Sequence, residues 1–332
     1  MNGIKIKMIK NKRILITGAT GFIGANLARL FLKKGAQISV LLRHASIAWR
    51  IKDIIKDIDK YSVDLLERKN LQRIIKRIRP EIIFHTAVYG GYFFQNDPRK
   101  ILETNFMGSV NLIEACQGVD FKLFVNTSSS SEYGIKDSPM RENDLLEPSN
   151  DYGSSKACAT LFAYSRAKKE GLPLVTLRLF SPYGYYDDPS RLIPSVILSC
   201  LKGKAPCVSK PDNVRDFIFI NDILDLYELL LKYKNKVGAK IFNVGSGSQY
   251  TVAEVVNKII KLTGGKVSPK WGAIVNSRTE PDFWQADITK AKRELNWAPK
   301  TNLSHGLEKT IHWFQNNKHL YENVNKSLRL YH

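Results

Sequence analysis

Short apolar segments alternate with longer helix-like segments over residues 1–180 of this chain of 332 residues. The apolar segments are 13–18, 36–43, 81–87, 121–128 and 172–180. The segments between them have helical periodicity, as in "FIGANLARLFLKKG", or end at a helix breaker, as 64–80 does at Pro80. Parallel strands buried on both faces appear as such apolar segments, and helices connect them. The pattern predicts an α/β fold with a Rossmann-type doubly wound parallel sheet.

The alternation breaks down after about residue 180, where Pro, Tyr, Asp and Gly cluster in "SPYGYYDDPSRLIP". Shorter, mixed elements follow, which indicates a smaller C-terminal substrate-binding lobe interleaved with the sheet. We expect a dinucleotide-binding Rossmann domain over 1–180, with later returns near 216–246, and the smaller lobe over 181–320. The polar stretch 321–332 is predicted to be a frayed tail.

Composition narrows the class of protein. The chain is 43% hydrophobic and 25% charged, and it has no apolar run near the ~18 residues of a membrane span. Its start lacks the apolar core of a signal peptide, so we expect a cytoplasmic location and no membrane partner. The four cysteines have no metal-like spacing; we expect no metal site, and buried free thiols at Cys116 and Cys158.

The formal net charge of +20 has two interpretations. It indicates an anionic partner, either nucleic acid or a phosphorylated small molecule, or a lysine-rich background spread over solvated faces. Basic residues occur throughout, in "KIKMIKNKR", "RIIKRIR" and "KYKNK", which favours the second interpretation. Nucleic acid is therefore not the expected partner, although anionic substrates would gain some electrostatic steering.

A glycine-rich loop joins the first predicted strand to the first predicted helix. It reads Gly18-Ala-Thr-Gly21-Phe-Ile-Gly24, a G-x-x-G-x-x-G pattern. Glycine suits a tight turn and a close approach of backbone to a pyrophosphate that faces a helix N-terminus. The alternative is a tight strand-to-helix turn without a ligand. The context favours dinucleotide binding, by Gly18, Thr20, Gly21, Phe22, Ile23 and Gly24.

The end of the second predicted strand indicates which dinucleotide binds. An acid usually binds the ribose hydroxyls of NAD there, but the sequence reads Leu42-Arg43-His44. Arg43 can bind the 2′-phosphate of NADP, with Ser46 and Arg50 as helpers, so we expect NADP. If Arg43 instead covers the adenine face, NAD is the alternative.

Tyr152 and Lys156 lie four residues apart, on one face of a predicted helix over 149–171. A free tyrosine has a pKa near ~10. A neighbouring ammonium stabilises the phenolate and lowers that pKa, which brings the phenol toward general acid and base catalysis. Lys156 can also bind the nicotinamide ribose. The spacing alone is common, but after a dinucleotide loop it predicts a catalytic pair.

Together these motifs resemble the extended short-chain dehydrogenase/reductase family of sugar-nucleotide epimerases and dehydratases. The resemblance covers about residues 12–315 and rests on motifs in the family's order. They are "TGATGFIG", "FHTA", "TNFMGSVNLIEAC", "NTSSSSEYG", "YGSSK", "RLFSPYG", "RDFIFINDI", "FNVGSG" and "ADITKAKRELNWAP".

The resemblance implies roles for the serines of "TSSSSEYG". The family's catalytic Ser or Thr precedes the glycine of "YG" by five residues, which matches Ser129, a catalytic and substrate-binding residue. Ser128 would help beside the cofactor, and Thr127, also at the cofactor, would point toward packing. Family dehydratases carry Asp and Glu at the next two positions, where this chain has Ser130, a substrate contact, and Ser131. Glu132 comes one position too late, so a dehydratase is disfavoured.

Further positions follow from the resemblance. Asp64 and the backbone at Leu65 would bind adenine, and Ala87 would lie along the pyrophosphate and ribose. Asn105 would be structural, and Ser181 would contact nicotinamide and substrate. We expect the substrate's diphosphate to be bound by arginines of the second lobe, which are Arg191, Arg215 and Arg278, the last with Asp282. His85 is expected to be a packed core residue, and neither it nor His44 is assigned a role.

The missing acid and the missing dehydratase pair favour an NADPH-dependent reduction of a 4-keto deoxysugar nucleotide, with the proton from Tyr152. The wording of several motifs is similar to the branch of CDP-abequose and CDP-paratose synthases. An NAD-dependent sugar-nucleotide 4-epimerase is the alternative, and a catalytically inactive dinucleotide- or RNA-binding protein is a remote one. The resemblance also implies a homodimer, formed through helices near 97–117 and 151–170.

Overall fold

The computed structural model describes residues 9–43, 48–92, 94–274 and 281–322. Its centre is a seven-stranded sheet in the order β10-β6-β5-β4-β1-β2-β3, with every pairing parallel. The strands are β1 (Arg13–Thr17), β2 (Gln37–Leu42), β3 (Asp59–Ser62), β4 (Ile82–His85), β5 (Leu123–Ser129), β6 (Leu174–Leu179) and β10 (Lys240–Val244). The predicted Rossmann-type sheet is confirmed.

The order of the strands reverses between β1 and β4. From β1 the chain proceeds to β2 and β3 on one side, and from β4 it proceeds to β5, β6 and β10 on the other. In open α/β sheets, ligands bind outside the carboxyl ends of the strands at such a reversal. The loops that follow β1, β4 and β5 therefore frame the expected site.

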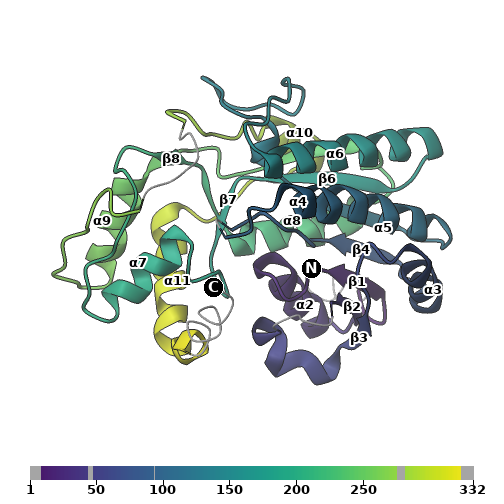
Figure 1. The fold of residues 1–332 in the computed structure, drawn as a ribbon, viewed down its shortest axis with the longest axis horizontal. Coiled ribbons are helices and arrows are strands. Elements are labelled where there is room, and N and C mark those ends of the chain that lie inside the picture. The colour runs from purple at the N-terminus through teal and green to yellow at the C-terminus, as the bar shows by residue number, and fades with distance from the viewer. Residues whose placement is uncertain (1–8, 44–47, 93, 275–280, 323–332) are drawn as a thin grey trace.

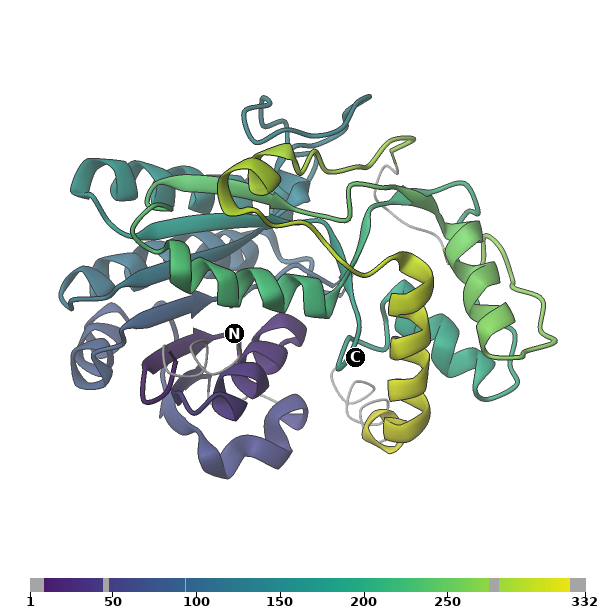
Figure 2. The same cartoon turned by 180° about the vertical axis from the view of Figure 1, so that it is seen from behind.

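Helices cover both faces of the sheet (Figures 1 and 2). The alternation along β1 shows how, because Ile14 and Ile16 pack in one hydrophobic cluster and Leu15 packs in another. The first cluster includes side chains of α2 (Phe22–Lys33), α8 (Ile220–Tyr233) and α10 (Thr289–Leu295). The second includes side chains of α3 (Arg68–Ile78), α5 (Gly108–Gln117) and α6 (Asp151–Glu170).

The predicted helix over 97–117 contains a π-helical segment. It consists of α4 (Pro98–Leu102), the π turn η2 (Glu103–Met107) and α5. The π turn holds Asn105, which is 1% exposed and whose side chain binds both the amide and the carbonyl of Tyr89. The same side chain donates to the Ser155 hydroxyl at 2.9 Å. This buried asparagine therefore fixes the segment after β4 against α6.

The second lobe has its own hydrophobic cluster and lies to the left of the sheet in Figure 1. It contains α7 (Leu192–Cys200), α9 (Val252–Leu262) and α11 (Leu303–Asn317). Short pairs of strands connect it to the sheet, β7 (Ser181–Tyr183) with β9 (Phe217–Phe219) and β8 (Val214–Arg215) with β11 (Tyr250–Thr251). The sequence placed α10 in this lobe, but α10 packs against β10 and α8 of the sheet domain.

Three expectations about single residues have different outcomes. Cys116 is buried as predicted, but Cys158 is exposed because it lies on the outer face of α6. Tyr321, which the sequence placed in a frayed tail, is 1% exposed and donates to the Asp187 carbonyl at 2.9 Å. The tail's last ten residues, 323–332, lie outside the described residues.

No helix within the described ranges is both long and apolar enough to cross a membrane.

Candidate active site

In the glycine loop after β1, backbone lies directly against backbone. Gly18 has a φ of +68°, and a Cβ on it would lie 2.6 Å from the amide nitrogen of Ala87, just after β4. A Cβ on Gly24 would lie 2.4 Å from the carbonyl oxygen of Gly18. Gly21 precedes α2, whose first turn carries no acidic side chain. These residues fit a dinucleotide pyrophosphate at the amino end of α2.

Other predicted cofactor residues lie around this loop. Phe22 packs in the hydrophobic cluster of the second lobe, and Ile23 packs against the clusters of both lobes. Ala87 touches the loop, as its predicted place along the pyrophosphate requires. The amino end of α2 is therefore held by both halves of the molecule.

At the adenosine end, Arg43 follows β2 and is exposed. The Asp64 carboxylate, after β3, accepts from the Leu66 amide at 2.9 Å, and the Leu65 carbonyl accepts from the Asn111 side chain at 2.9 Å. The loop after β3 is thus ordered by Asp64 within it and by Asn111 of α5. Ser46, a predicted helper of Arg43, lies outside the described residues.

The prediction that Arg50 helps Arg43 bind a 2′-phosphate is wrong. Arg50 is 6% exposed and forms an ion pair with Asp188 at 3.0 Å. Its guanidinium also donates to the carbonyls of Tyr186, at 2.7 Å, and Thr20, at 3.1 Å. Arg50 therefore joins the glycine loop to the segment 184–191 of the second lobe. The sequence offered one signal for this contact, the paired aspartates of "YYDDP".

The segment 185–188 is bound to the sheet domain along its backbone as well. The Asn26 side chain donates to the Tyr185 carbonyl at 2.8 Å, and Arg29 stacks over the Tyr186 ring at 4.1 Å. Burial raises the pKa of Asp187 to about 7, partly opposed by Arg191 and by a hydrogen bond from the Asp188 amide. The two lobes thus meet through polar contacts beside the predicted pyrophosphate site.

The three predicted catalytic residues lie at the end of β5 and in the first turns of α6. Ser129 is the last residue of β5, and its hydroxyl oxygen accepts from the Ser131 amide at 3.1 Å. A Cβ on Gly153 would lie 2.4 Å from the Ser131 carbonyl oxygen, so α6 presses its start against this turn. Tyr152, next to Gly153, is half-buried, and one edge of its ring faces Gly90.

Lys156 is 2% exposed, and its ammonium donates to the Thr127 carbonyl at 2.7 Å. Burial lowers the pKa of Lys156 to about 8, although the charge of Glu132 acts in the opposite direction. His85 is a packed core residue, as predicted, bound to the hydroxyls of Thr17 and Ser109. Burial, with the charge of Lys156, lowers the pKa of His85 to about 3, so it stays neutral.

The neighbouring serine and threonine side chains point into the protein. The Thr127 hydroxyl lies 2.5 Å from the Tyr227 hydroxyl, in line with its predicted packing role. Ser128 binds Glu132, and Thr160 donates to Ser128 at 3.0 Å. A cofactor contact from Ser128 through its side chain would require it to leave Glu132. Sequence reasoning gave Glu132 no place, yet it is 0% exposed and paired with Arg178 at 2.7 Å.

The remaining substrate candidates lie in several different segments. Ser130 is 4% exposed, and the Ser181 amide donates to the Asp216 carbonyl at 2.9 Å. Arg191 donates to the Gly91 carbonyl at 2.7 Å and stacks over Tyr92.

Arg215 stacks over Trp284 and donates to its neighbour's carbonyl at 2.6 Å. Arg278 lies outside the described residues. The structure therefore brings Arg191 to the segment after β4 and keeps Arg215 within the second lobe.

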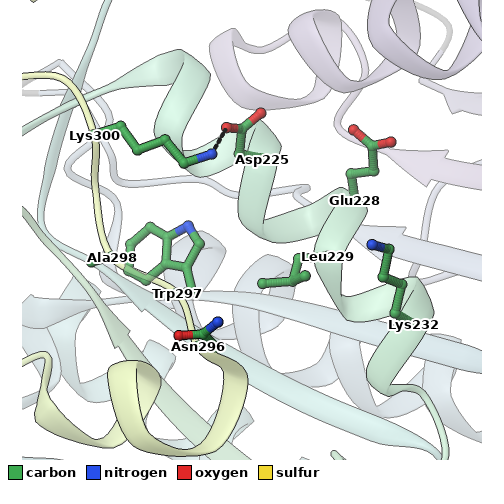
Figure 3. A pocket seen from close by; sticks show the side chains of 8 residues that line it. All are labelled: Asp225, Glu228, Leu229, Lys232, Asn296, Trp297, Ala298 and Lys300. Carbon is green, nitrogen blue, oxygen red and sulfur yellow. Dashed lines mark hydrogen bonds and ion pairs between the residues drawn. The ribbon is translucent and has the colours of Figure 1, made fainter. Parts of the chain in front are cut away.

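A small surface hollow elsewhere is no alternative active site. It lies between α8 and residues 296–300, around Trp297 and the ion pair of Lys300 with Asp225 (Figure 3). None of the predicted catalytic or cofactor residues lines it. Among the described residues, no group of three or more His, Cys, Asp or Glu could hold a metal ion.

Comparisons with known proteins identify the family. Residues 14–245 match the model of the "NAD dependent epimerase/dehydratase family". The chain is 27% identical to dTDP-glucose 4,6-dehydratase of Neisseria meningitidis, over 96% of this chain and 98% of that protein.

Two solved structures are similar. The first is dTDP-glucose 4,6-dehydratase of Bacillus anthracis with NAD, with a TM-score of 0.82 and 26% identity over 93% of this chain and 98% of that one. The second is UDP-glucose 4-epimerase of Thermotoga maritima with UDP-glucose, with a TM-score of 0.84 and 25% identity over 92% and 99%.

This chain therefore belongs to the NAD-dependent epimerase/dehydratase family, and it is an NAD(P)-dependent nucleotide-sugar enzyme of the extended short-chain dehydrogenase/reductase type. The relatives named here are dehydratases and an epimerase, so they lend no support to the CDP-abequose synthase branch.

The glycine loop yields the first prediction. Gly18→Ala should weaken dinucleotide binding about tenfold or more, ~1.4 kcal/mol, because the new methyl group collides with the backbone after β4. Fluorescence titration with NADH and NADPH measures this. Gly171→Ala is the matched control, since Gly171 has a φ of +66° but nothing within 4 Å of its Cβ position. Gly171→Ala should only lower the free energy of unfolding in urea, by the ~1–2 kcal/mol that a side chain costs at positive φ. Wild-type binding by Gly18→Ala would contradict the assignment.

Proposed function

We propose that this enzyme reduces the 4-keto group of a nucleotide-linked deoxysugar with NADPH. The observation that carries the proposal is the turn after β5. Family dehydratases need an acid and a base there, and this chain has Ser130 and Ser131. The next residue, Glu132, is a carboxylate without access to substrate, because it is fully buried and paired with Arg178. Ser129, Tyr152 and Lys156, which carbonyl reduction requires, are all present.

The cofactor and the protein supply different parts of the reaction. When bound, the reduced nicotinamide supplies the hydride that adds to the carbonyl carbon. Ser129 donates a hydrogen bond to the carbonyl oxygen, and the Tyr152 phenol gives that oxygen its proton as the C=O π bond breaks. Lys156, held by the Thr127 carbonyl, stabilises the phenolate left behind. The product is a hydroxyl group at the same carbon.

The cofactor preference rests on Arg43 and on the lack of an acid at the end of β2. A guanidinium suits the 2′-phosphate of NADP, and it cannot accept hydrogen bonds from ribose hydroxyls. NAD is the alternative, since the similar structure from Bacillus anthracis was solved with NAD. The second candidate function is a 4-epimerase with retained NAD, favoured by the similarity to UDP-glucose 4-epimerase. We propose Arg191, Arg215 and Arg278 as the residues that bind the substrate's diphosphate.

The reaction is tested by following reduced-cofactor absorbance with a 4-keto-6-deoxy sugar nucleotide and NADPH or NADH. UDP- and CDP-hexose interconversion is measured separately, without added cofactor. Tyr152→Phe should lower kcat by ~10²–10⁴-fold with cofactor binding retained, because the proton donor is lost. Tyr164→Phe, on the exposed face of the same helix, is the control and should retain activity. Interconversion alone, with copurified NAD, would replace the reductase by the epimerase.

Turnover should fall as pH rises through about 8. Lys156 holds its ammonium below that pH and loses it above, because burial lowers its pKa to about 8. The initial rate of keto reduction, measured at saturating substrate on both sides of this pH, checks the prediction. A rate that stays constant up to pH ~10.4, the usual pKa of a lysine, would contradict this prediction.

We further propose that the enzyme forms a homodimer through α4, η2, α5 and α6. These helices expose apolar side chains, including Leu102 at 41%, Met107 at 43% and Leu161 at 56%. Leu161→Asp should shift the protein toward monomer, measured by light scattering after size exclusion, because a charge cannot be buried there without a partner. Leu145→Asp is the control, since Leu145 is 72% exposed but lies outside these helices. A monomeric wild type would refute the proposal.

A further inference from the structure

Glu132 is a buried charge that the chemistry above does not use. It lies in the turn η3 (Ser130–Glu132) and is 0% exposed. Its carboxylate accepts from Arg178 Nε of β6 at 2.7 Å and from the Thr160 hydroxyl of α6 at 2.6 Å. It also accepts from the Ser128 hydroxyl of β5. A carboxylate without such partners would be expensive to bury, so these contacts explain how it is tolerated.

Two of these partners lie beside the catalytic residues. Thr160 is one turn beyond Lys156 on the same face of α6, as the spacing of four residues requires. Ser128 lies between Thr127, whose carbonyl holds Lys156, and Ser129. The carboxylate of Glu132 therefore connects the helix that carries Tyr152 and Lys156 to the strand that carries Ser129.

Helix α6 meets the end of β5 at three successive levels. Gly153 lies against the Ser131 backbone, Lys156 donates to the Thr127 carbonyl, and Thr160 donates to Glu132. The first two contacts belong to the catalytic turn of the helix. The third lies one turn deeper, and it is a charge-assisted hydrogen bond to a residue that Arg178 fixes from the neighbouring strand.

We propose that Glu132 is a positioning residue, which sets Tyr152 and Lys156 against Ser129 and keeps Lys156 charged. The inference rests on the proposed function only in that it assumes Tyr152 and Lys156 act together. Any proton transfer by this pair, in reduction or in epimerisation, would depend on the same geometry.

The charges around Lys156 support the electrostatic half of the proposal. His85 of β4 is neutral, Tyr152 lies on the same helix, and Glu132 of η3 is the negative group whose charge raises the pKa of Lys156 against burial. Arg178 of β6, with the Tyr133 hydroxyl 2.8 Å from it, balances Glu132. Glu132 is joined through Thr160 to the same face of α6 as Lys156, so neutralising it would remove the negative charge that favours the ammonium of Lys156.

Different variants test the two halves of the proposal, the positioning of the catalytic pair and the electrostatic effect on Lys156. Thr160→Val removes the hydroxyl contacts with Glu132 and Ser128 but no charge. It should lower kcat by about tenfold to 10²-fold with KM nearly unchanged, because a small misplacement of reacting groups is costly. Thr160→Ser should restore the rate. Glu132→Gln should lower kcat and also move the basic limb of the pH–kcat profile to lower pH, since Lys156 loses its proton more easily.

Glu142→Gln is the matched control. Glu142 contacts Arg178 through its backbone carbonyl, but its carboxylate accepts from the Asn243 amide and does not reach α6. Glu142→Gln should keep the wild-type kcat and the wild-type basic limb of the pH–kcat profile. If Thr160→Val retains full kcat, the positioning half is overturned; if the basic limb of Glu132→Gln does not move, the electrostatic half is overturned. Should Glu132→Gln fail to fold, Thr160→Val and its serine rescue decide the positioning half.

A second readout needs no activity and so separates this inference from the proposed reaction. Carbon-13 NMR of labelled lysine side chains, with Lys156→Arg to assign the resonance, follows the ionisation of Lys156 directly. It should titrate near pH 8 in wild type and in Glu142→Gln, and at lower pH in Glu132→Gln. Such a shift in an enzyme that reduces no keto sugar would refute the reaction and retain the inference. An unshifted Lys156 would overturn the electrostatic half whatever the reaction.

Discussion

The close approach of the β1 loop to the end of β4 is the constraint on which the site depends. Gly18 lies so near the backbone of Thr86 and Ala87 that no side chain fits between them. Because strand order reverses at this pair, the same contact forms the wall of the crevice where the ligand is expected. Gly24 then allows α2 to start against the Gly18 carbonyl, which aims the helix at the crevice.

The second lobe is attached at the same place. Arg50 binds the Thr20 carbonyl within the glycine loop, and it binds Asp188 and the Tyr186 carbonyl across the junction. A guanidinium has donors in several directions in one plane, so a single buried side chain can satisfy all three acceptors. Arg50 thus contacts the glycine loop and the second lobe at once, and it fixes the two against each other at the site.

Local features of the fold could be predicted from the sequence, and long-range partners could not. The strands, the glycine loop and the Tyr152–Lys156 spacing all follow from patterns within a few residues. Arg50, by contrast, finds Asp188 at a separation of 138 residues, and Glu132 finds Arg178 at 46. Apart from the paired aspartates of "YYDDP", no local pattern indicates such pairs, which explains why the sequence suggests a phosphate for Arg50 and no role for Glu132. The expected burial of Cys158 is wrong for a related reason, because its apolar neighbours lie on a helix face whose surroundings depend on other elements.

The turn after β5 also limits which reactions are open to this site. Elimination needs a carboxylate that can exchange a proton with the sugar, and Glu132 cannot exchange one while Arg178, Thr160 and Ser128 bind both of its oxygens. Serines at 130 and 131 supply hydrogen bonds but no acid of suitable pKa. The function we propose therefore assigns proton transfer to the phenol of Tyr152, with Lys156, held by the Thr127 carbonyl, to stabilise its charge. A site with one proton carrier suits hydride transfer at a single carbon, which is the step that reduction and epimerisation have in common. Dehydration needs a further acid and base in addition to that step.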